Sequence, residues 1–159
     1  MFKKFFTLKN SSIGVVIVIL MIGIVWSQLD IRKVEQSAIV IAQVTQFRAG
    51  LSAYMAERGA YPEGQRITFT GSGVEGSGAA LLCVGASPAS LEGFLKEGEM
   101  CDGTTIFRFS DIVLQMPFVY HSNGKTYSIA FFLPRAFGAF RGSGVYCAKE
   151  TGIVRGKCA

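Results

Sequence analysis

The sequence predicts an α+β fold in which one long N-terminal helix packs against a small antiparallel β-sheet. An apolar run, Ile13–Trp26, continues without proline or a turn cluster into a polar but periodic segment that reaches Tyr54. Runs rich in β-branched and aromatic residues fill the last third of the chain, and two of them flank Asn123-Gly124, a strong hairpin signature. The length of 159 residues leaves room for one domain and an anchor.

The first half of the predicted helix is long and apolar enough to lie in a lipid bilayer. Residues 13–29 would form roughly 26 Å of helix at ~1.5 Å per residue, close to the ~30 Å hydrocarbon core. Lys3, Lys4 and Lys9 precede this run and supply three of the five net positive charges, which leaves 13 of the 16 basic residues against 11 acidic ones. Because positive residues beside a span stay in the cytoplasm, we expect the N-terminus inside and the rest of the chain outside.

A cleaved secretory signal peptide is the alternative, since it has the same basic start and apolar core. No small-x-small cleavage site follows the run, where Val25-Trp26-Ser27-Gln28-Leu29 stands, and the helical pattern continues. We therefore expect a retained anchor with Trp26 at the interface. The predicted divisions are a basic cytoplasmic leader (1–12), the transmembrane half of the helix (13–29), its amphipathic half (30–58) and an extracytoplasmic α+β domain (59–159).

The second half of the helix is predicted to be amphipathic, with apolar side chains every three or four residues. Gly59 suits a helix C-cap and Tyr61-Pro62 prevents continuation, so the helix should end near Arg58. In the apolar half, Gly14 and Gly23 are expected to let a neighbouring helix approach closely. The apolar stripe consists of Val34, Ala38, Ile41, Val44, Phe47 or Arg48, Leu51, and Tyr54 or Met55.

The remainder of the chain is predicted to hold short elements. Residues 63–78 are rich in Gly and Ser and contain one β-prone piece, Arg66–Thr70. Ser87-Pro88 suits the start of a short helix that would run to Leu95 or Lys96. The expected antiparallel meander consists of Phe118–His121, Thr126–Leu133, Gly144–Ala148 and Ile153–Arg155.

All four cysteines lie in the part predicted to be outside, and an even number in an oxidising compartment indicates two disulfides. Three connectivities are open. We favour Cys83–Cys101 with Cys147–Cys158, because each bond would clamp a loop-rich, Gly-rich region. A zinc site is disfavoured, because the spacings are long and His121 is the one histidine.

No catalytic constellation stands out, and we expect a non-enzymatic protein without a cofactor or metal. His121 is expected to be a solvated turn residue beside Asn123-Gly124. The glycines at 71, 73, 76 and 78 lack the Lys-Ser/Thr and strand-to-helix junction of a phosphate loop. Arg135, Arg141 and Arg155 suggest a basic patch near the C-terminus, for which a solvated face is the default interpretation and nucleic-acid binding the alternative.

Two stretches of the sequence resemble a known family. The long helix leads into Ala53-Tyr54-Met55-Ala56-Glu57-Arg58-Gly59-Ala60-Tyr61-Pro62, and Tyr120 is followed by Asn123-Gly124-Lys125-Thr126-Tyr127-Ser128-Ile129. Together these resemble type IV pilins and the pseudopilins of type II secretion, in which such a helix ends in Gly-x-Tyr-Pro before a loop and a Tyr-containing hairpin. Cys147 and Cys158 are similar to the disulfide-bounded C-terminal loop of many pilins.

The start of the helix departs from the family pattern. Members are usually cut after a Gly that precedes a Phe-Thr-Leu-Ile-Glu-like start, and the Glu matters for subunit packing. Here Phe5 stands where the Gly should be, Phe6 begins the segment, and Asn10 stands where the Glu should be. The pattern therefore argues against processing of the leader by the family's prepilin peptidase.

The resemblance implies a structural, membrane-anchored subunit of a type IV pilus or type II secretion-like filament. The departure at its start suggests a minor, terminal or divergent subunit. Its expected partners are the membrane, other pilin-like subunits and the assembly machinery of a bacterial envelope. The alternative is a single-pass envelope protein with a small extracytoplasmic binding domain, for DNA uptake or surface adhesion.

Overall fold

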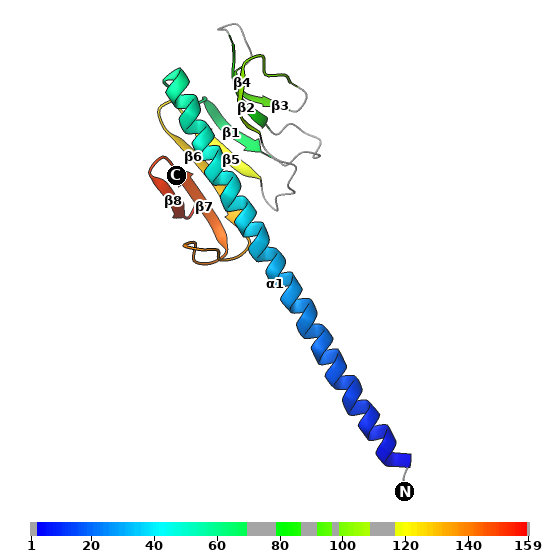
Figure 1. Ribbon diagram of the computed structural model, residues 1–159. Coiled ribbons are helices and arrows are strands. Elements are labelled where there is room, and N and C mark those ends of the chain that lie inside the picture. Colours follow the sequence, from blue (N-terminus) through cyan, green and yellow to red (C-terminus); the bar gives the residue numbers. More distant parts are fainter. Residues whose placement is uncertain (1–2, 70–78, 87–91, 97–98, 109–116, 159) are drawn as a thin grey trace.

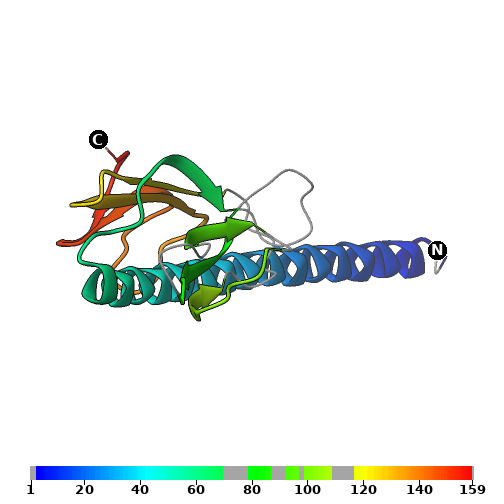
Figure 2. The same cartoon turned by 90° about the horizontal axis from the view of Figure 1, so that it is seen from above.

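The computed structural model describes residues 3–69, 79–86, 92–96, 99–108 and 117–158, with side chains from residue 15 onward except those of residues 29, 79 and 80. A helix of 56 residues, α1 (Lys3–Arg58), is followed by two antiparallel sheets beside its C-terminal half (Figure 1). The N-terminal half of α1 extends beyond both sheets (Figure 2). The predicted α+β fold, a long N-terminal helix packed on antiparallel β-structure, is confirmed.

The larger sheet contains the predicted meander. The hairpin around Asn123-Gly124 is confirmed: Ser122 pairs with Tyr127, and Asn123 Oδ1 accepts hydrogen bonds from the backbone N–H groups of Lys125 and Thr126 at 3.0 and 2.9 Å. A strand also forms in the described part of the Gly- and Ser-rich region after the helix, residues 63–69, as expected. The five strands lie in the order β1 (Gly64–Phe69), β5 (Phe118–Ser122), β6 (Tyr127–Leu133), β7 (Gly144–Lys149) and β8 (Gly152–Arg155).

A second sheet of three strands was not predicted. It has the order β3 (Gly93–Lys96), β2 (Ala79–Val84) and β4 (Thr104–Arg108). The sequence of β2, Ala-Ala-Leu-Leu-Cys-Val, has no alternation that would mark it as a strand. The helix predicted to run to Leu95 or Lys96 is wrong for Gly93–Lys96, which forms β3, while its start at residues 87–91 lies outside the described residues.

Two separate clusters explain why this segment is extended. Phe94 packs into the main core, with its ring centroid 5.1 Å from that of Phe69 and 4.8 Å from that of Tyr120. Its neighbour Leu95 is buried in a second cluster with Leu81 and the disulfide of Cys83. Successive side chains point to opposite faces of a strand, so only an extended backbone serves both clusters at once.

The main core lies between the C-terminal half of α1 and the sheets, with α1 packed on β4 and β6. The helix contributes one buried face at steps of three and four residues: Val40, Val44, Phe47, Leu51 and Tyr54. The predicted stripe is therefore right over its C-terminal part. It is wrong at Val34, which is 37% exposed, because the domain first covers α1 at the buried Ser37 and Val40.

Candidate functional site

The N-terminal half of α1 is apolar and uncovered. The large apolar side chains of residues 15–26 are 52–73% exposed, and nothing lies within 4 Å of a Cβ added at Gly23. The most apolar 18-residue window of the helix from Val15 has a mean hydropathy of 2.0, and none of it is buried. The chain therefore has one described helix long and apolar enough to cross a membrane.

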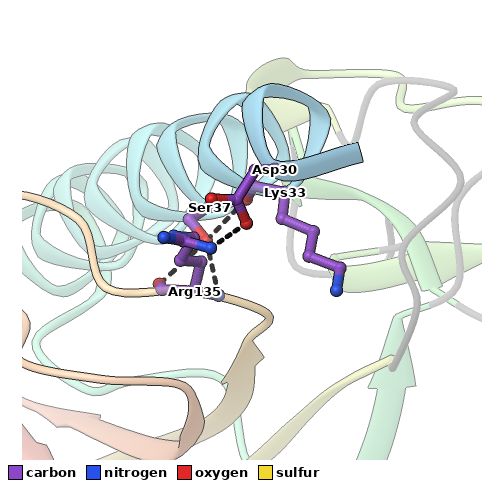
Figure 3. Close-up of polar contacts among 4 residues, drawn as sticks. All are labelled: Asp30, Lys33, Ser37 and Arg135. Carbon is purple, nitrogen blue, oxygen red and sulfur yellow. Dashed lines mark hydrogen bonds and ion pairs between the residues drawn. The ribbon is translucent and has the colours of Figure 1, made fainter. Parts of the chain in front are cut away.

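A polar junction begins where this uncovered half ends. Asp30 on α1 forms an ion pair with Nη1 of Arg135, which lies just after β6 (Figure 3). The Arg135 backbone N–H donates to Ser37 Oγ at 3.1 Å, and that hydroxyl lies 3.0 Å from the carbonyl oxygens of both Lys33 and Arg135. Lys33 contributes its carbonyl here, while its side chain points away from the cluster (Figure 3).

This junction fixes the β6–β7 connection to the helix at the level where the apolar run gives way to charged residues. Ser37 is fully buried and satisfies backbone groups that the packing would otherwise leave unpaired. Because an exposed ion pair contributes little stability, Ser37 holds the attachment more than the half-exposed Asp30–Arg135 pair does.

The helix ends as predicted, and its exit docks on the hairpin. Gly59 adopts φ = +73° and its N–H donates to the Met55 carbonyl at 2.8 Å, which closes the C-cap. The Tyr61 N–H donates to the Gly124 carbonyl at 2.8 Å. The two sequence stretches that carry the family resemblance are thus in contact, although Tyr61 and Gly124 are 63 positions apart in the sequence.

Tyr120 connects the same two stretches from inside the core. Its hydroxyl donates to the Pro62 carbonyl at 2.8 Å, and its ring stacks on that of Tyr127 with centroids 6.3 Å apart. Burial raises the pKa of the Tyr120 hydroxyl well above its ordinary range, because the charged phenolate would lose its hydration. Burial also raises the pKa of Tyr54 and Tyr61, and the Glu92 and Glu150 carboxylates add to these respective shifts.

The structure contains the two disulfides that the sequence analysis favoured. Cys83–Cys101 links β2 to the loop after β3, and Cys147–Cys158 links β7 to the C-terminal segment. Each closes a short loop, with sequence separations of 18 and 11 residues. The first bond therefore attaches a loop to the three-stranded sheet, and the second attaches the C-terminal segment to the five-stranded sheet.

The predicted basic patch is only partly assembled. Arg141 and Arg155 line one recess, whereas Arg135 is paired with Asp30 at the junction. Arg48, on α1, joins the recess instead. The sequence analysis did not assign Arg48 to the basic patch, because it treated Phe47 and Arg48 as alternatives for one position of the apolar stripe. The structure buries Phe47 and leaves Arg48 half-exposed at the edge of the core.

His121 lies at the C-terminal part of β5, opposite Ser128 and Gln65, and is half-buried rather than a solvated turn residue. It lines an open recess of about 490 Å³ together with Tyr127 and Lys149. Within the described ranges, no group of three or more His, Cys, Asp or Glu side chains is placed to hold a metal ion. The glycines at 71, 73, 76 and 78 lie outside the described residues.

The predicted processing region is helical. Phe5, Phe6 and Asn10 lie in the first turns of α1, and Gly14 follows one turn later. Their side chains lie outside the described part of the structure.

Comparison of the chain with models of protein families, with curated proteins and with solved structures finds no match.

Proposed function

We propose that the chain is a non-enzymatic, membrane-anchored, pilin-like subunit of a type IV pilus or type II secretion-like filament. The observation that carries the proposal is the division of α1. One continuous helix is uncovered and apolar through residues 15–26, and from residue 37 onward one of its faces is buried by the domain. Such a helix suits a subunit that is stored in a bilayer and transferred into a bundle of equivalent helices.

The uncovered half requires an apolar surrounding. Burying a large aliphatic side chain is worth about 1.5–3 kcal/mol, so leaving residues 15–26 in water would cost on the order of 20 kcal/mol. Lipid tails or neighbouring apolar helices relieve this cost equally well. Exchange of lipid for helices is therefore driven by packing and hydrogen bonding between helices, and not by hydrophobic burial.

The small residues of this half favour a bundle over a dimer. Gly14 and Gly23 are nine residues apart, or two and a half turns at ~3.6 residues per turn, so they lie on opposite sides of α1. One partner helix would use one of these close-approach positions. A subunit with neighbours on both sides would use both.

The charge and cysteine pattern supports the orientation. The lysines at positions 3, 4 and 9 favour a cytoplasmic N-terminus, and two disulfides suit a domain held in an oxidising compartment. Asn10 carries no charge to pair with a neighbouring subunit's amino terminus in lipid. We therefore infer a minor, terminal or divergent position in the filament rather than that of its repeating subunit.

The test is a cysteine scan of residues 15–26 in native membranes, with oxidative crosslinking read as higher-mass species on non-reducing gels. A bundle predicts crosslinks that rise and fall with the helical period and peak on two sides of α1. Mass spectrometry of the same samples identifies the crosslinked partners and reports whether the leader is present.

An exposed position of the folded domain, Ser143→Cys, is the control for random collisions in the membrane. If crosslinks at residues 15–26 are no more frequent than at this control, the chain is a stand-alone anchor. The filament proposal then fails, and a single-pass protein with a binding domain replaces it.

A further inference from the structure

We propose that the recess between α1, the β6–β7 connection and β8 is an oxyanion-binding site for a phosphate or carboxylate group from the aqueous compartment. The recess has a volume of about 560 Å³. Three arginines from three different elements converge on it: Arg48 from α1, Arg141 from the β6–β7 connection, and Arg155 from β8. This site goes beyond the filament proposal and does not depend on assembly.

Among the described residues, none of the three guanidinium groups forms an ion pair. In the described part of the chain, the ion pairs are Arg58–Glu92 and Arg135–Asp30, and neither involves an arginine of the recess. Glu150, the acidic residue nearest to Arg48, lines a neighbouring recess that Arg48 also borders, and it accepts from Arg48 through its backbone carbonyl and forms no ion pair with it. Three like charges around one recess repel one another, and a bound anion removes that repulsion.

Arg155 is held in place by the backbone. Its two terminal nitrogens donate to the carbonyl oxygens of Arg141 at 3.2 Å and Ser143 at 3.0 Å. Gly142 permits this arrangement, because it adopts φ = +102°, a backbone conformation that residues with a side chain rarely adopt. The guanidinium is therefore fixed before any ligand arrives, which lowers the entropic cost of binding.

Donor capacity remains on all three side chains. A guanidinium has five N–H donors. Arg155 uses two, and Arg48 uses two, with Nε donating to the Tyr127 hydroxyl at 3.4 Å and a terminal nitrogen to the Glu150 carbonyl at 3.2 Å. The Arg141 side chain donates to no described group, so it is the arginine most available to a ligand.

Apolar side chains line the part of the recess between the arginines. Phe140 and Tyr146 meet edge to face, with ring centroids 5.6 Å apart, and Ile153 lies beside them. Arg141 and Arg155 are exposed to solvent, so these apolar side chains shield a bound anion only on the side that faces the protein. The arrangement thus provides both the charge and the surroundings that an oxyanion site needs.

The position of the site excludes lipid of the bilayer that holds the anchor. Arg48 lies 19 residues beyond residue 29, or roughly 28 Å along the helix at ~1.5 Å per residue. The headgroup layer on each side of a bilayer is only about 5–7 Å thick. The ligand is therefore a soluble oxyanion or a group carried on another extracytoplasmic molecule.

The test is NMR of the ¹⁵N-labelled full chain in a maltoside detergent, titrated with inorganic phosphate or citrate at constant ionic strength. Saturable shifts of the Nε–Hε signals of Arg48, Arg141 and Arg155 are expected. Arg141→Gln should weaken the affinity about tenfold, since a hydrogen bond to a charged group is worth about that factor. The matched control, Arg108→Gln on β4, removes the same charge from an exposed site and should leave the affinity unchanged.

Two outcomes would overturn the inference. Shifts of all exposed basic residues that do not saturate would show ionic screening and no site. Binding of a single-stranded oligonucleotide without any response to phosphate or citrate would indicate an extended nucleic-acid surface instead. Neither outcome bears on the crosslinking of residues 15–26.

Discussion

The two halves of α1 share one backbone and differ in what surrounds them. Val18 and Val44 are both valines of α1, yet the side chain of Val18 is 57% exposed and that of Val44 is fully buried. Around Val18 apolar side chains occupy every side of the helix, whereas around Val44 they form one stripe. The second half is therefore stabilised by the chain's own domain, and the first half is suited to an environment that the chain does not supply.

The sharpest way to expose this difference is to truncate one large side chain in each half. Phe47 is fully buried, and its ring centroid lies 5.1 Å from that of Phe69 and 5.4 Å from that of Phe107. Phe47→Ala should lower the free energy of unfolding of the domain by about 3–5 kcal/mol, because it removes buried area and leaves a cavity. Denaturant titration of the full chain in detergent, followed by tyrosine fluorescence, measures the change.

Ile19→Ala is the matched control in the uncovered half. It removes a large side chain that touches nothing in the folded domain, so the denaturation midpoint should not move. A loss of more than about 1 kcal/mol in Ile19→Ala would mean that the apolar half stabilises the domain, and the two halves would not be independent.

An aspartate substitution should have its large effect in the first half of α1, whereas the alanine substitution should have its large effect in the second half. Ile19→Asp should disfavour membrane insertion by about 2.5–3.5 kcal/mol, the cost of an aspartate near the centre of a spanning helix. Ala42→Asp places the same charge on an exposed position of the second half and should leave insertion unchanged. Carbonate extraction of membranes measures the inserted fraction, and equal loss from both variants would contradict the assignment of residues 13–29 to the bilayer.

Sequence reasoning worked where one local rule decided the structure. The C-cap at Gly59 follows from the left-handed backbone that glycine accepts, and the Asn123-Gly124 turn follows from the preference of Asn for bonding its own neighbours. The two halves of α1 were distinguished by the spacing of their apolar residues, which is continuous in the first half and every three or four residues in the second. These signals need no knowledge of distant residues.

The sequence failed where distant packing decided. Gly93–Lys96 is extended because Phe94 and Leu95 are needed in different clusters, and neither cluster is visible before the chain is folded. Arg48 joined Arg141 and Arg155 for the same reason, since α1 passes beside β8 only in the folded domain. Arg135 left the predicted patch because Asp30, 105 residues earlier, pairs with it.

The segment that follows the C-terminal end of α1 is held to the core by one buried hydroxyl, that of Tyr120. Tyr120→Phe should lower the free energy of unfolding near pH 7 by about 1–3 kcal/mol, because the Pro62 carbonyl loses its donor inside the core. The pKa of Tyr120 is raised on folding, so the folded chain keeps a proton that the unfolded chain releases above about pH 10. The stabilisation that comes from the raised pKa of Tyr120 is therefore fully present below about pH 10 and is lost as the pH rises further.

The pH dependence distinguishes the hydroxyl from general packing. In Tyr120→Phe the fall above pH 10 should be shallower than in the unaltered chain, but still present, because the pKa values of Tyr54 and Tyr61 are also raised. Denaturation at pH 7 and at pH 10–11 gives both quantities. Identical slopes in the two proteins would show that Tyr120 does not carry the alkaline loss.

The junction between the halves should show the smallest effect. Asp30 and Arg135 have side chains 49% and 46% exposed, so a double-mutant cycle of Asp30→Asn and Arg135→Gln should give a coupling of about 0.2–1 kcal/mol in detergent. Glu35→Gln, an exposed acidic residue of the same helix, should show no coupling to Arg135→Gln. Repeating the cycle in lipid bilayers tests whether lipid or another molecule covers the junction, because removal of water from the pair would raise the coupling above the detergent value. An unchanged coupling would mean that the junction lies in open water, where neither lipid nor another molecule covers it.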